Sequence, residues 1–297
     1  MHSAAADKES ERGPSPSGPR RPSPLDQVRA ALLGTLPQAQ RDVLPERWER
    51  LGRVLVLPLP AALDAWREPV CAAYARVLGC EAVVRDAGPI RGALREPLRE
   101  LLWGQSTETV HVEGGVRYAM DAARVMWSSG NVNERQRIAP LVRPGERVLD
   151  LFAGIGYFTL PVAVKARPER VVACEANPEA FRWLERNLAL NKVQERVEAR
   201  LGDCREVAPM AWADRVLLGY TLATERFLPT ALAALRAEGG MLHHHEASPA
   251  HLWQEQAWGH VRDAAREAGR EAELLDQRIV KNYAPGKVHV VVDARVR

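Results

Sequence analysis

Short apolar runs alternate with helical stretches along the second half of the chain, beginning directly after Pro144-Gly145-Glu146. The runs have the length of strands, and they cover residues 147–152, 170–175, 197–202, 214–219 and 240–245. The intervening segments, such as residues 176–191, have the spacing of amphipathic helices. Apolar strands that alternate with helices predict a mostly parallel sheet that is covered on both faces. The second half of the chain is therefore predicted to form a doubly wound α/β fold.

The first half of the chain follows a different pattern and contains no recognisable catalytic motif. The pattern predicts strands over 53–57, 83–85, 108–112 and 116–120, helices over 25–38 and 61–78, and a hairpin turn at Glu113-Gly114-Gly115. Residues 1–24 are rich in Ser, Pro and Arg, which is typical of a disordered tail. We therefore expect this tail, a small α+β module over 25–120, and a larger α/β domain over 121–297.

Composition bears on the binding partners and the cellular compartment of the protein. The net charge of +3 is mild, but the positive charge is carried mostly by Arg, which suits phosphates and stacked bases. The four cysteines show neither a C-x-x-C pair nor a zinc-like spacing to His, so we expect reduced thiols, a cytoplasmic protein and no metal. No apolar run approaches the roughly 18 residues of a membrane span, and the N-terminal segment lacks the apolar core of a signal peptide.

The first apolar run of the second half leads into Asp150-Leu-Phe-Ala-Gly154-Ile-Gly156, and a predicted helix follows over 157–166. Glycines at such a turn let the backbone approach a ligand closely and direct the N–H groups of the helix terminus at it. Asp150, at the end of the strand, could accept a hydrogen bond from an ammonium group or an ordered water. An ordinary strand-to-helix turn is the alternative, because a single G-x-G pattern is weak evidence.

Two further acids follow the next two strands. Glu175 stands 25 residues after Asp150, close to the roughly 20-residue offset at which such folds place a ribose-binding carboxylate. Asp203, followed by Cys204, could accept from an adenine amino group. Taken singly, Glu175 could cap the next helix and Asp203 could be an ordinary loop residue. Three acids at successive strand ends together predict a nucleoside cofactor.

The details of the turn favour S-adenosylmethionine (SAM) over a dinucleotide. A dinucleotide site requires a third glycine three residues after Gly156, where this chain has Thr159. SAM carries no phosphate and does not need that glycine. Upstream, the guanidinium of Arg135 and the hydroxyl of Ser128 could hold the carboxylate of an amino-acid moiety. The alternative for this upstream segment is the start of a surface helix capped by Asn131 or Asn133.

These segments together resemble one family, the tRNA aminocarboxypropyltransferases of wybutosine biosynthesis, which are related to the tRNA guanine-37 N1-methyltransferases. The resemblance extends from about residue 118 to the C-terminus. It is carried by Met126-Trp-Ser-Ser-Gly-Asn, Glu134-Arg-Gln-Arg, Asp150-Leu-Phe-Ala-Gly-Ile-Gly-Tyr-Phe-Thr-Leu-Pro, Cys174-Glu-Ala-Asn-Pro, Ala213-Asp-Arg-Val-Leu-Leu-Gly and Val280-Lys-Asn-Tyr-Ala-Pro.

The resemblance implies a class I SAM-dependent methyltransferase-like, Rossmann-like fold and an enzyme that uses SAM as co-substrate. The implied reaction transfers the 3-amino-3-carboxypropyl group to C7 of 4-demethylwyosine at position 37 of tRNA-Phe and releases methylthioadenosine. The implied partner is the anticodon arm, which the N-terminal module would help to bind. By the same resemblance, Ser128 and Arg135 hold the methionine portion of SAM, Glu175 binds its ribose, and Asp203 and Cys204 contact its adenine.

The segment after the fourth strand distinguishes two related activities. Methyltransferases that act on a base nitrogen usually carry Asn/Asp-Pro-Pro or Asn-Leu-Pro there, whereas this chain has Leu218-Gly-Tyr-Thr-Leu222. The sequence therefore favours aminocarboxypropyl transfer, without a covalent enzyme intermediate, by positioning of the two substrates. A SAM-dependent tRNA methyltransferase is the first alternative, and an inactive protein that binds SAM and RNA is the second.

Two segments near the C-terminus permit more than one interpretation. The run His243-His-His-Glu246 resembles a metal-ligand cluster, but strand alternation sends His244 to the opposite face from its two neighbours, which argues against a metal. Lys281 and Tyr283 could hold a phosphate and stack on a splayed base of the RNA. An ordinary turn before a closing strand over 287–292 is the alternative for this second segment.

Overall fold

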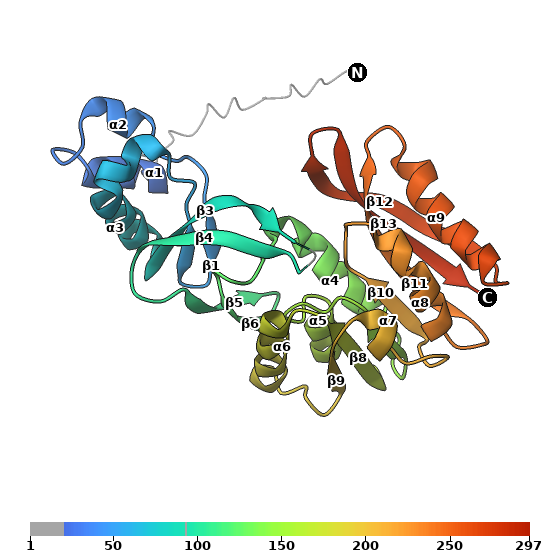
Figure 1. Ribbon diagram of the computed structural model, residues 1–297. Coiled ribbons are helices and arrows are strands. Elements are labelled where there is room, and N and C mark those ends of the chain that lie inside the picture. The colour runs from blue at the N-terminus through green and yellow to red at the C-terminus, as the bar shows by residue number, and fades with distance from the viewer. Residues whose placement is uncertain (1–20, 93) are drawn as a thin grey trace, which may run out of the picture.

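The computed structural model describes residues 21–92 and 94–297, so most of the predicted tail lies outside the described residues. Two bodies are visible in Figure 1, a smaller N-terminal module and a larger α/β domain. The first helix, α1 (Pro24–Ala31), begins at a proline and is capped by Ser23, whose hydroxyl accepts from the backbone N–H of Asp26.

The α/β domain is built on a seven-stranded sheet in the order β12-β13-β11-β10-β7-β8-β9. Its strands are β7 (Arg147–Asp150), β8 (Arg170–Glu175), β9 (Val197–Leu201), β10 (Arg215–Leu218), β11 (Gly240–Pro249), β12 (Ala272–Ala284) and β13 (Lys287–Val296). The first five are parallel, and β13 runs antiparallel to both β11 and β12. The five apolar runs in the sequence are thus confirmed as strands of a doubly wound sheet.

Helices cover both faces of this sheet, because both faces are apolar. Neighbouring residues Val148 and Leu149 of β7 enter two different hydrophobic clusters, one on each side. The helices of the domain are α4 (Val132–Leu141), α5 (Thr159–Lys165), α6 (Pro178–Leu190), α7 (Cys204–Val207), α8 (Leu228–Ala234) and α9 (Trp253–Glu267), with single 3₁₀ turns η2 (Ser129–Asn131) and η3 (Thr224–Phe227). No helix in the described part of the chain is both long and apolar enough to cross a membrane.

The N-terminal module contains a four-stranded sheet with helices packed against it (Figure 1). Its strands are β1 (Glu49–Leu51), β2 (Val54–Val56), β3 (Ala82–Arg91) and β4 (Glu96–Trp103), and its helices after α1 are α2 (Gln38–Asp42), η1 (Ala61–Trp66) and α3 (Arg67–Leu78). The expected helix over 25–38 ends at Ala31. The strands β1 and β4 were not predicted. In β4, the half-exposed sequence lacks strict apolar alternation and contains a proline.

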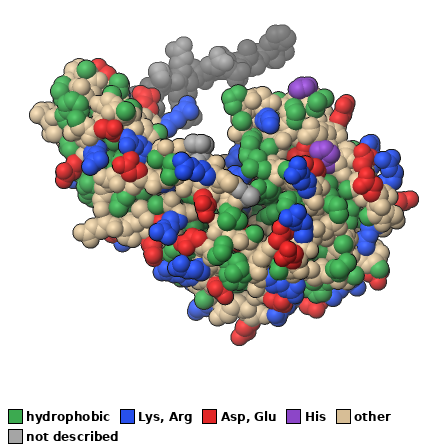
Figure 2. Space-filling model, viewed as in Figure 1, with side chains coloured by type: hydrophobic (Ala, Val, Ile, Leu, Met, Phe, Trp, Pro, Cys, Tyr) green, Lys and Arg blue, Asp and Glu red, His purple; other side chains and the backbone are tan. Residues whose placement is uncertain are grey.

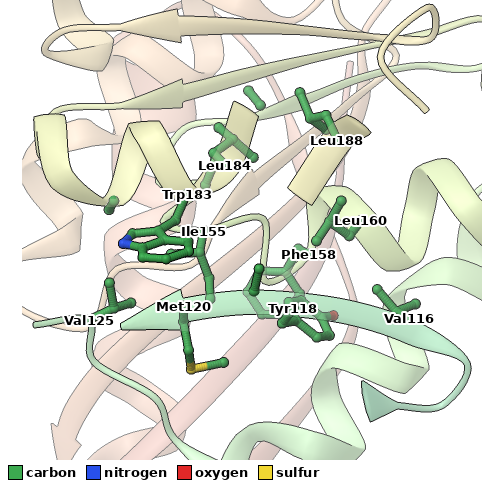
Figure 3. Close-up of a cluster of buried hydrophobic side chains, with 14 of the residues drawn as sticks. Val116, Tyr118, Met120, Val125, Ile155, Phe158, Leu160, Trp183, Leu184 and Leu188 are labelled. Carbon is green, nitrogen blue, oxygen red and sulfur yellow. The ribbon is translucent and has the colours of Figure 1, made fainter. Parts of the chain in front are cut away.

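A separate hairpin, β5 (Glu108–Glu113) and β6 (Val116–Asp121), joins the module to the α/β domain. The side chain of Asn187 in α6 accepts from the backbone N–H of Ala119 at 2.6 Å and donates to its carbonyl at 3.0 Å. On the other side, Thr109 Oγ1 accepts from the backbone N–H of Arg53 at 2.9 Å. Figure 3 shows part of the hydrophobic cluster around β6, in which Tyr118 and Met120 lie with Ile155 and Leu184. The hairpin therefore holds the two bodies together through one continuous core.

Candidate active site

A cavity of about 650 Å³ opens at the carboxyl ends of the central strands. Parallel strands in such sheets place ligands at this edge. The loops after β7, β8, β9 and β10 line the cavity, together with the segment that joins β6 to α4, the tip of the β3–β4 hairpin, and residues of β12 and β13. In Figure 2, Lys and Arg side chains, interspersed with Asp and Glu, lie on both the N-terminal module and the α/β domain of the visible face.

The glycines of the first loop have different surroundings. Gly154 lines the cavity with φ +56°, and a Cβ atom at this position would lie 2.3 Å from the ring of Tyr157. Gly156, with φ +102°, is not among the lining residues, and a Cβ atom there would meet Leu160 at 2.7 Å. The first glycine thus lets the ring of Tyr157 pack against the loop at the cavity wall, while the second permits close packing beneath the loop.

Asp150 lies beneath the loop and not at the cavity surface. Its carboxylate accepts from the hydroxyl of Thr159 at 2.8 Å and from the backbone N–H of Phe152 at 3.3 Å. Burial raises the pKa of Asp150 to about 6. The sequence suggested a direct contact between this acid and the ligand, but full burial places it where it supports the backbone of the loop instead.

Glu175, at the end of β8, lines the cavity as predicted for a ribose acceptor. One oxygen accepts from the N–H of Gly154 and the other from the N–H of Asn177, both at 2.7 Å. Burial raises the pKa of Glu175, and the two backbone N–H groups act in the opposite direction. Each carboxylate oxygen has a second lone pair, so the fixed side chain can accept from ligand hydroxyls as well.

Asp203 and Cys204 lie together at the next loop, and both line the cavity. Asp203 is the N-cap of α7, and its carboxylate accepts from the backbone N–H and the guanidinium of Arg205. The side-chain hydrogen bond from Arg205 lowers the pKa of Asp203. Burial raises the pKa of the Cys204 thiol to about 12, so this side chain stays neutral. Beside them, Phe152 and Phe227 form an aromatic wall that was not predicted, with ring centroids 4.9 Å apart.

Arg135 requires a correction to the expected carboxylate clamp. Its guanidinium forms a two-point pair with Glu113 at 2.8 and 2.6 Å and donates to the carbonyl of Ser128 at 2.8 Å. It also lies over the ring of Trp127, and its side chain is only 2% exposed. Arg135 lines the cavity, but its guanidinium is therefore already paired within the protein. The surface-helix alternative is confirmed in part, since Asn131 is the N-cap of α4, but this helix buries Glu134 and Arg135 and is not confined to the surface.

Two other cations line the cavity near Ser128. Lys281 of β12 donates to the hydroxyl of Ser128, and burial lowers the pKa of Lys281. Arg95, next to the tip of the β3–β4 hairpin, donates to Thr221 at 3.3 Å. Lys281 and Tyr283 were singled out in the sequence for RNA, and both line the cavity. Arg95 was missed, because nothing in the sequence indicates that the first module reaches this site.

The histidine run of β11 divides between the two faces of the sheet, as alternation predicts. His243 contacts Asp293 at 2.6 Å and His245 contacts His289 at 3.0 Å on one face. On the other face, His244 and Glu246 approach His260 of α9, and their ligand atoms lie within 4.8 Å of one another. Four donors already surround this glutamate, namely Ser248, Gln256, His244 and His260. The arrangement is that of a buried, hydrogen-bonded carboxylate.

The strand order, the glycine loop after β7 and the carboxylate at the end of β8 define a class I SAM-dependent transferase fold. The TRM5/TYW2 methyltransferase domain matches residues 109–275, and the TYW2 N-terminal domain matches residues 28–107. The chain belongs to the TRM5/TYW2 family.

Relatives within this family include enzymes of both activities. The tRNA(Phe) (4-demethylwyosine(37)-C(7)) aminocarboxypropyltransferase of Pyrococcus horikoshii is 40% identical over 91% of this chain and 96% of its own length. The tRNA (guanine(37)-N(1))-methyltransferase Trm5b of Pyrococcus abyssi is 33% identical over 88% of this chain and 78% of its own length. The crystal structure of P. horikoshii TYW2 in complex with MeSAdo matches with a TM-score of 0.83 and 38% identity, covering 92% of this chain and 98% of that chain.

Proposed function

We propose that this protein transfers the 3-amino-3-carboxypropyl group of SAM to C7 of 4-demethylwyosine at position 37 of tRNA-Phe. The observation that carries the proposal is the cavity wall after β10, formed by Gly219, Tyr220 and Thr221. This wall has neither the carboxamide nor the carboxylate that would polarise a ring nitrogen. The match to the TYW2 N-terminal domain supports the same choice between the two activities of the family.

The residues of the cavity fit SAM in several respects. Glu175 offers a carboxylate for the ribose that the backbone N–H of Gly154 holds in place at the cavity wall. The aromatic wall and Asp203 suit the adenine. We propose that Lys281 and Arg95, with Ser128, take the role at the carboxylate of the amino-acid moiety that the sequence suggested for Arg135. Arg135 then acts indirectly, by fixing the backbone of Ser128.

Orientation decides which group leaves the sulfonium. Its three adjoining carbons are all activated, and the one that faces the nucleophile in line is transferred. In the proposed reaction, C7 of the base attacks the γ-carbon of the aminocarboxypropyl group. The γ-carbon–sulfur bond breaks, its electron pair stays on sulfur, and methylthioadenosine leaves. Neither a covalent enzyme intermediate nor a metal is needed for this displacement.

We propose that the N-terminal module grips the anticodon arm, since its hairpin carries Arg95 to the same cavity that receives the co-substrate. The module would then align the RNA with the transferred group. A cytoplasmic location is proposed on the free state of all four cysteines, which suits a reducing compartment.

An isotope experiment tests the proposed function. The protein is incubated with tRNA that carries the 4-demethylwyosine base and with SAM labelled either in the methyl carbon or in the carboxyl carbon. We expect carboxyl label in the RNA and methyl label in the released methylthioadenosine. Methyl label in the RNA would instead identify a methyltransferase. Absence of label from both donors, with SAM still bound, would identify an inactive binding protein.

A further inference from the structure

His289 is a buried histidine in the wall of the cavity, and the reaction described so far gives it no role. It lies in β13, opposite Lys281 of β12, and its side chain lines the cavity although the residue is only 1% exposed. It belongs to the β12–β13 pair at one edge of the sheet, and three strands separate β13 from β8, the strand that ends at Glu175. If the loops that carry Glu175 and Asp203 hold the nucleoside, this pair of strands faces the part of the cavity left for the acceptor base.

The two ring nitrogens of His289 have different surroundings. Its Nε2 atom lies 3.0 Å from Nδ1 of His245. Its Nδ1 atom is buried and has no hydrogen-bond partner within residues 21–92 and 94–297. An unpaired polar atom inside a protein is costly and needs an explanation, such as a catalytic role or a bound water or ion.

His245, the neighbour of His289, contacts a second polar group deeper in the protein. Its Nε2 atom lies 3.7 Å from a carboxylate oxygen of Glu134 in α4. Burial lowers the pKa of His245 to about 3, so its ring is neutral at pH 7. Arg137 holds the same carboxylate at 2.6 and 2.8 Å. Glu134, His245 and His289 therefore form a line of three polar groups that runs from the interior to the cavity.

This line favours one arrangement of protons. A carboxylate attracts the proton of His245 to Nε2, which leaves Nδ1 of His245 as an acceptor. The Nε2–H of His289 then donates to that acceptor, because a neutral imidazole carries one N–H. The remaining lone pair of His289 is on Nδ1, the unpartnered atom. Burial, followed by the proximity of His245 and Lys281, lowers the pKa of His289 to about 2, so its ring is neutral at pH 7.

We propose that Nδ1 of His289 accepts the proton that the acceptor carbon loses during transfer. The inference rests on the proposed function, in which a ring carbon already bonded to hydrogen forms a new bond to the γ-carbon of the aminocarboxypropyl group. Attack forms the carbon–carbon bond, the carbon–sulfur pair stays on sulfur, and the base becomes a cation. Its C–H electron pair returns to the ring as the proton moves to Nδ1. The proton passes to water after the products leave.

The environment of His289 suits this role. The carbon-protonated cation is a strong acid, so a weak base is sufficient to deprotonate it. The nearby cations Lys281 and Arg95 disfavour protonation of His289, and the negative charge of Glu134 acts in the opposite direction. Rapid return of the imidazole to its neutral form readies the site for the next turnover. His289 thus acts as a catalytic base, and His245 is a positioning residue behind it.

The test variant is His289→Gln, in which the amide can retain the contact to His245 but offers no basic atom in place of Nδ1. Single-turnover transfer is measured with carboxyl-labelled SAM and with acceptor tRNA that carries hydrogen or deuterium at C7. We expect transfer by the variant to fall by about 100-fold or more. Deuterium should slow the variant clearly and the unchanged protein hardly at all. Affinity for methylthioadenosine, measured by calorimetry, should be unchanged, and so should transfer by the control His251→Gln, an exposed residue outside the cavity.

Near-normal transfer by His289→Gln without an isotope effect would overturn the inference. If that variant does not fold, His245→Gln serves instead, since it breaks the line to Glu134 and leaves His289 in place. A smaller loss of rate with an isotope effect is then expected, and unchanged kinetics would overturn the inference equally. Failure of the proposed function has a different signature, because the unchanged protein would then transfer no carboxyl label at all.

Discussion

The backbone N–H of Gly154 donates to the carboxylate of Glu175 at 2.7 Å, across the ends of the neighbouring strands β7 and β8. This bond couples the shape of the glycine loop to the carboxylate proposed to bind ribose. The loop and the acid therefore form one unit, and a change in either should weaken binding of the co-substrate.

The replacement Glu175→Ala should weaken the binding of SAM and of methylthioadenosine by about 1.5–3 kcal/mol, the range for hydrogen bonds to a charged group. The fold should persist, because the lost bonds lie at a cavity wall. Isothermal calorimetry measures the affinities, with the exposed Glu185→Ala of α6 as a matched control. An affinity equal to that of the unchanged protein would mean that the ribose lies elsewhere.

The replacement Gly154→Ala should damage both the loop and co-substrate binding, since its Cβ atom would lie 2.3 Å from the ring of Tyr157. The control is Gly145→Ala, which has φ +82° and no atom within 4 Å of the added Cβ. The control should lose about 1–2 kcal/mol of unfolding free energy from left-handed strain alone. Gly154→Ala should lose more, and it should also bind methylthioadenosine more weakly. Equal losses in denaturant unfolding and equal affinities would contradict this explanation.

The replacement Arg135→Ala should destabilise the protein by about 3–5 kcal/mol, because it leaves the largely buried carboxylate of Glu113 without a partner. The replacement Arg186→Ala, which removes an exposed pair with Glu108, should cost less than about 1 kcal/mol. Urea unfolding measures both. Transfer should also suffer more from Arg135→Ala than from Arg137→Ala, because only Arg135 fixes the backbone of Ser128. A fully stable Arg135→Ala protein would show that the pair with Glu113 is not formed in solution.

Asp150 should make stability depend on pH in an unusual direction. Burial raises its folded-state pKa to about 6, above the ordinary value of 3.8. Between these values the folded state holds the proton more tightly than the unfolded state, so unfolding releases it and stability falls as pH rises. Relative to Asp150→Asn, the unchanged protein should lose about 2–3 kcal/mol between pH 4 and pH 7. Unfolding curves of both proteins across this range test the sign, and a difference that is constant with pH would refute it.

Chelation should leave both activity and stability unchanged. The displacement at the sulfonium needs no Lewis acid, and the carboxylate of Glu246 already accepts from four neighbouring side chains. Transfer rate and melting temperature are compared before and after dialysis against EDTA. A drop in melting temperature that zinc restores would assign a metal to His244, Glu246 and His260.

The large sheet could be predicted because strands buried on both faces leave continuous apolar runs, such as 170–175, in the sequence. Glu175 and Asp203 could be found because successive parallel strands end at the same edge. The partners of charged side chains could not be predicted in this way. Glu113 pairs with Arg135 across a separate hairpin, and no periodicity records that contact.

His289 shows a signal that could have been followed. It is the single polar residue at an inward position near the start of the apolar strand Val288-His-Val-Val-Val292. A polar residue in such a strand needs a partner or a function. Its partner, His245, is 44 positions away, and only the register between β11 and β13 brings the two together.

Arg95 belongs to the N-terminal module, yet it lines the cavity of the α/β domain. The catalytic chamber is thus completed by a segment outside the domain that carries its loops. Exchange of this module for that of a methyltransferase relative would therefore change the chamber itself as well as the grip on RNA. Within this family, the two parts of the chain are expected to be compatible only as a pair.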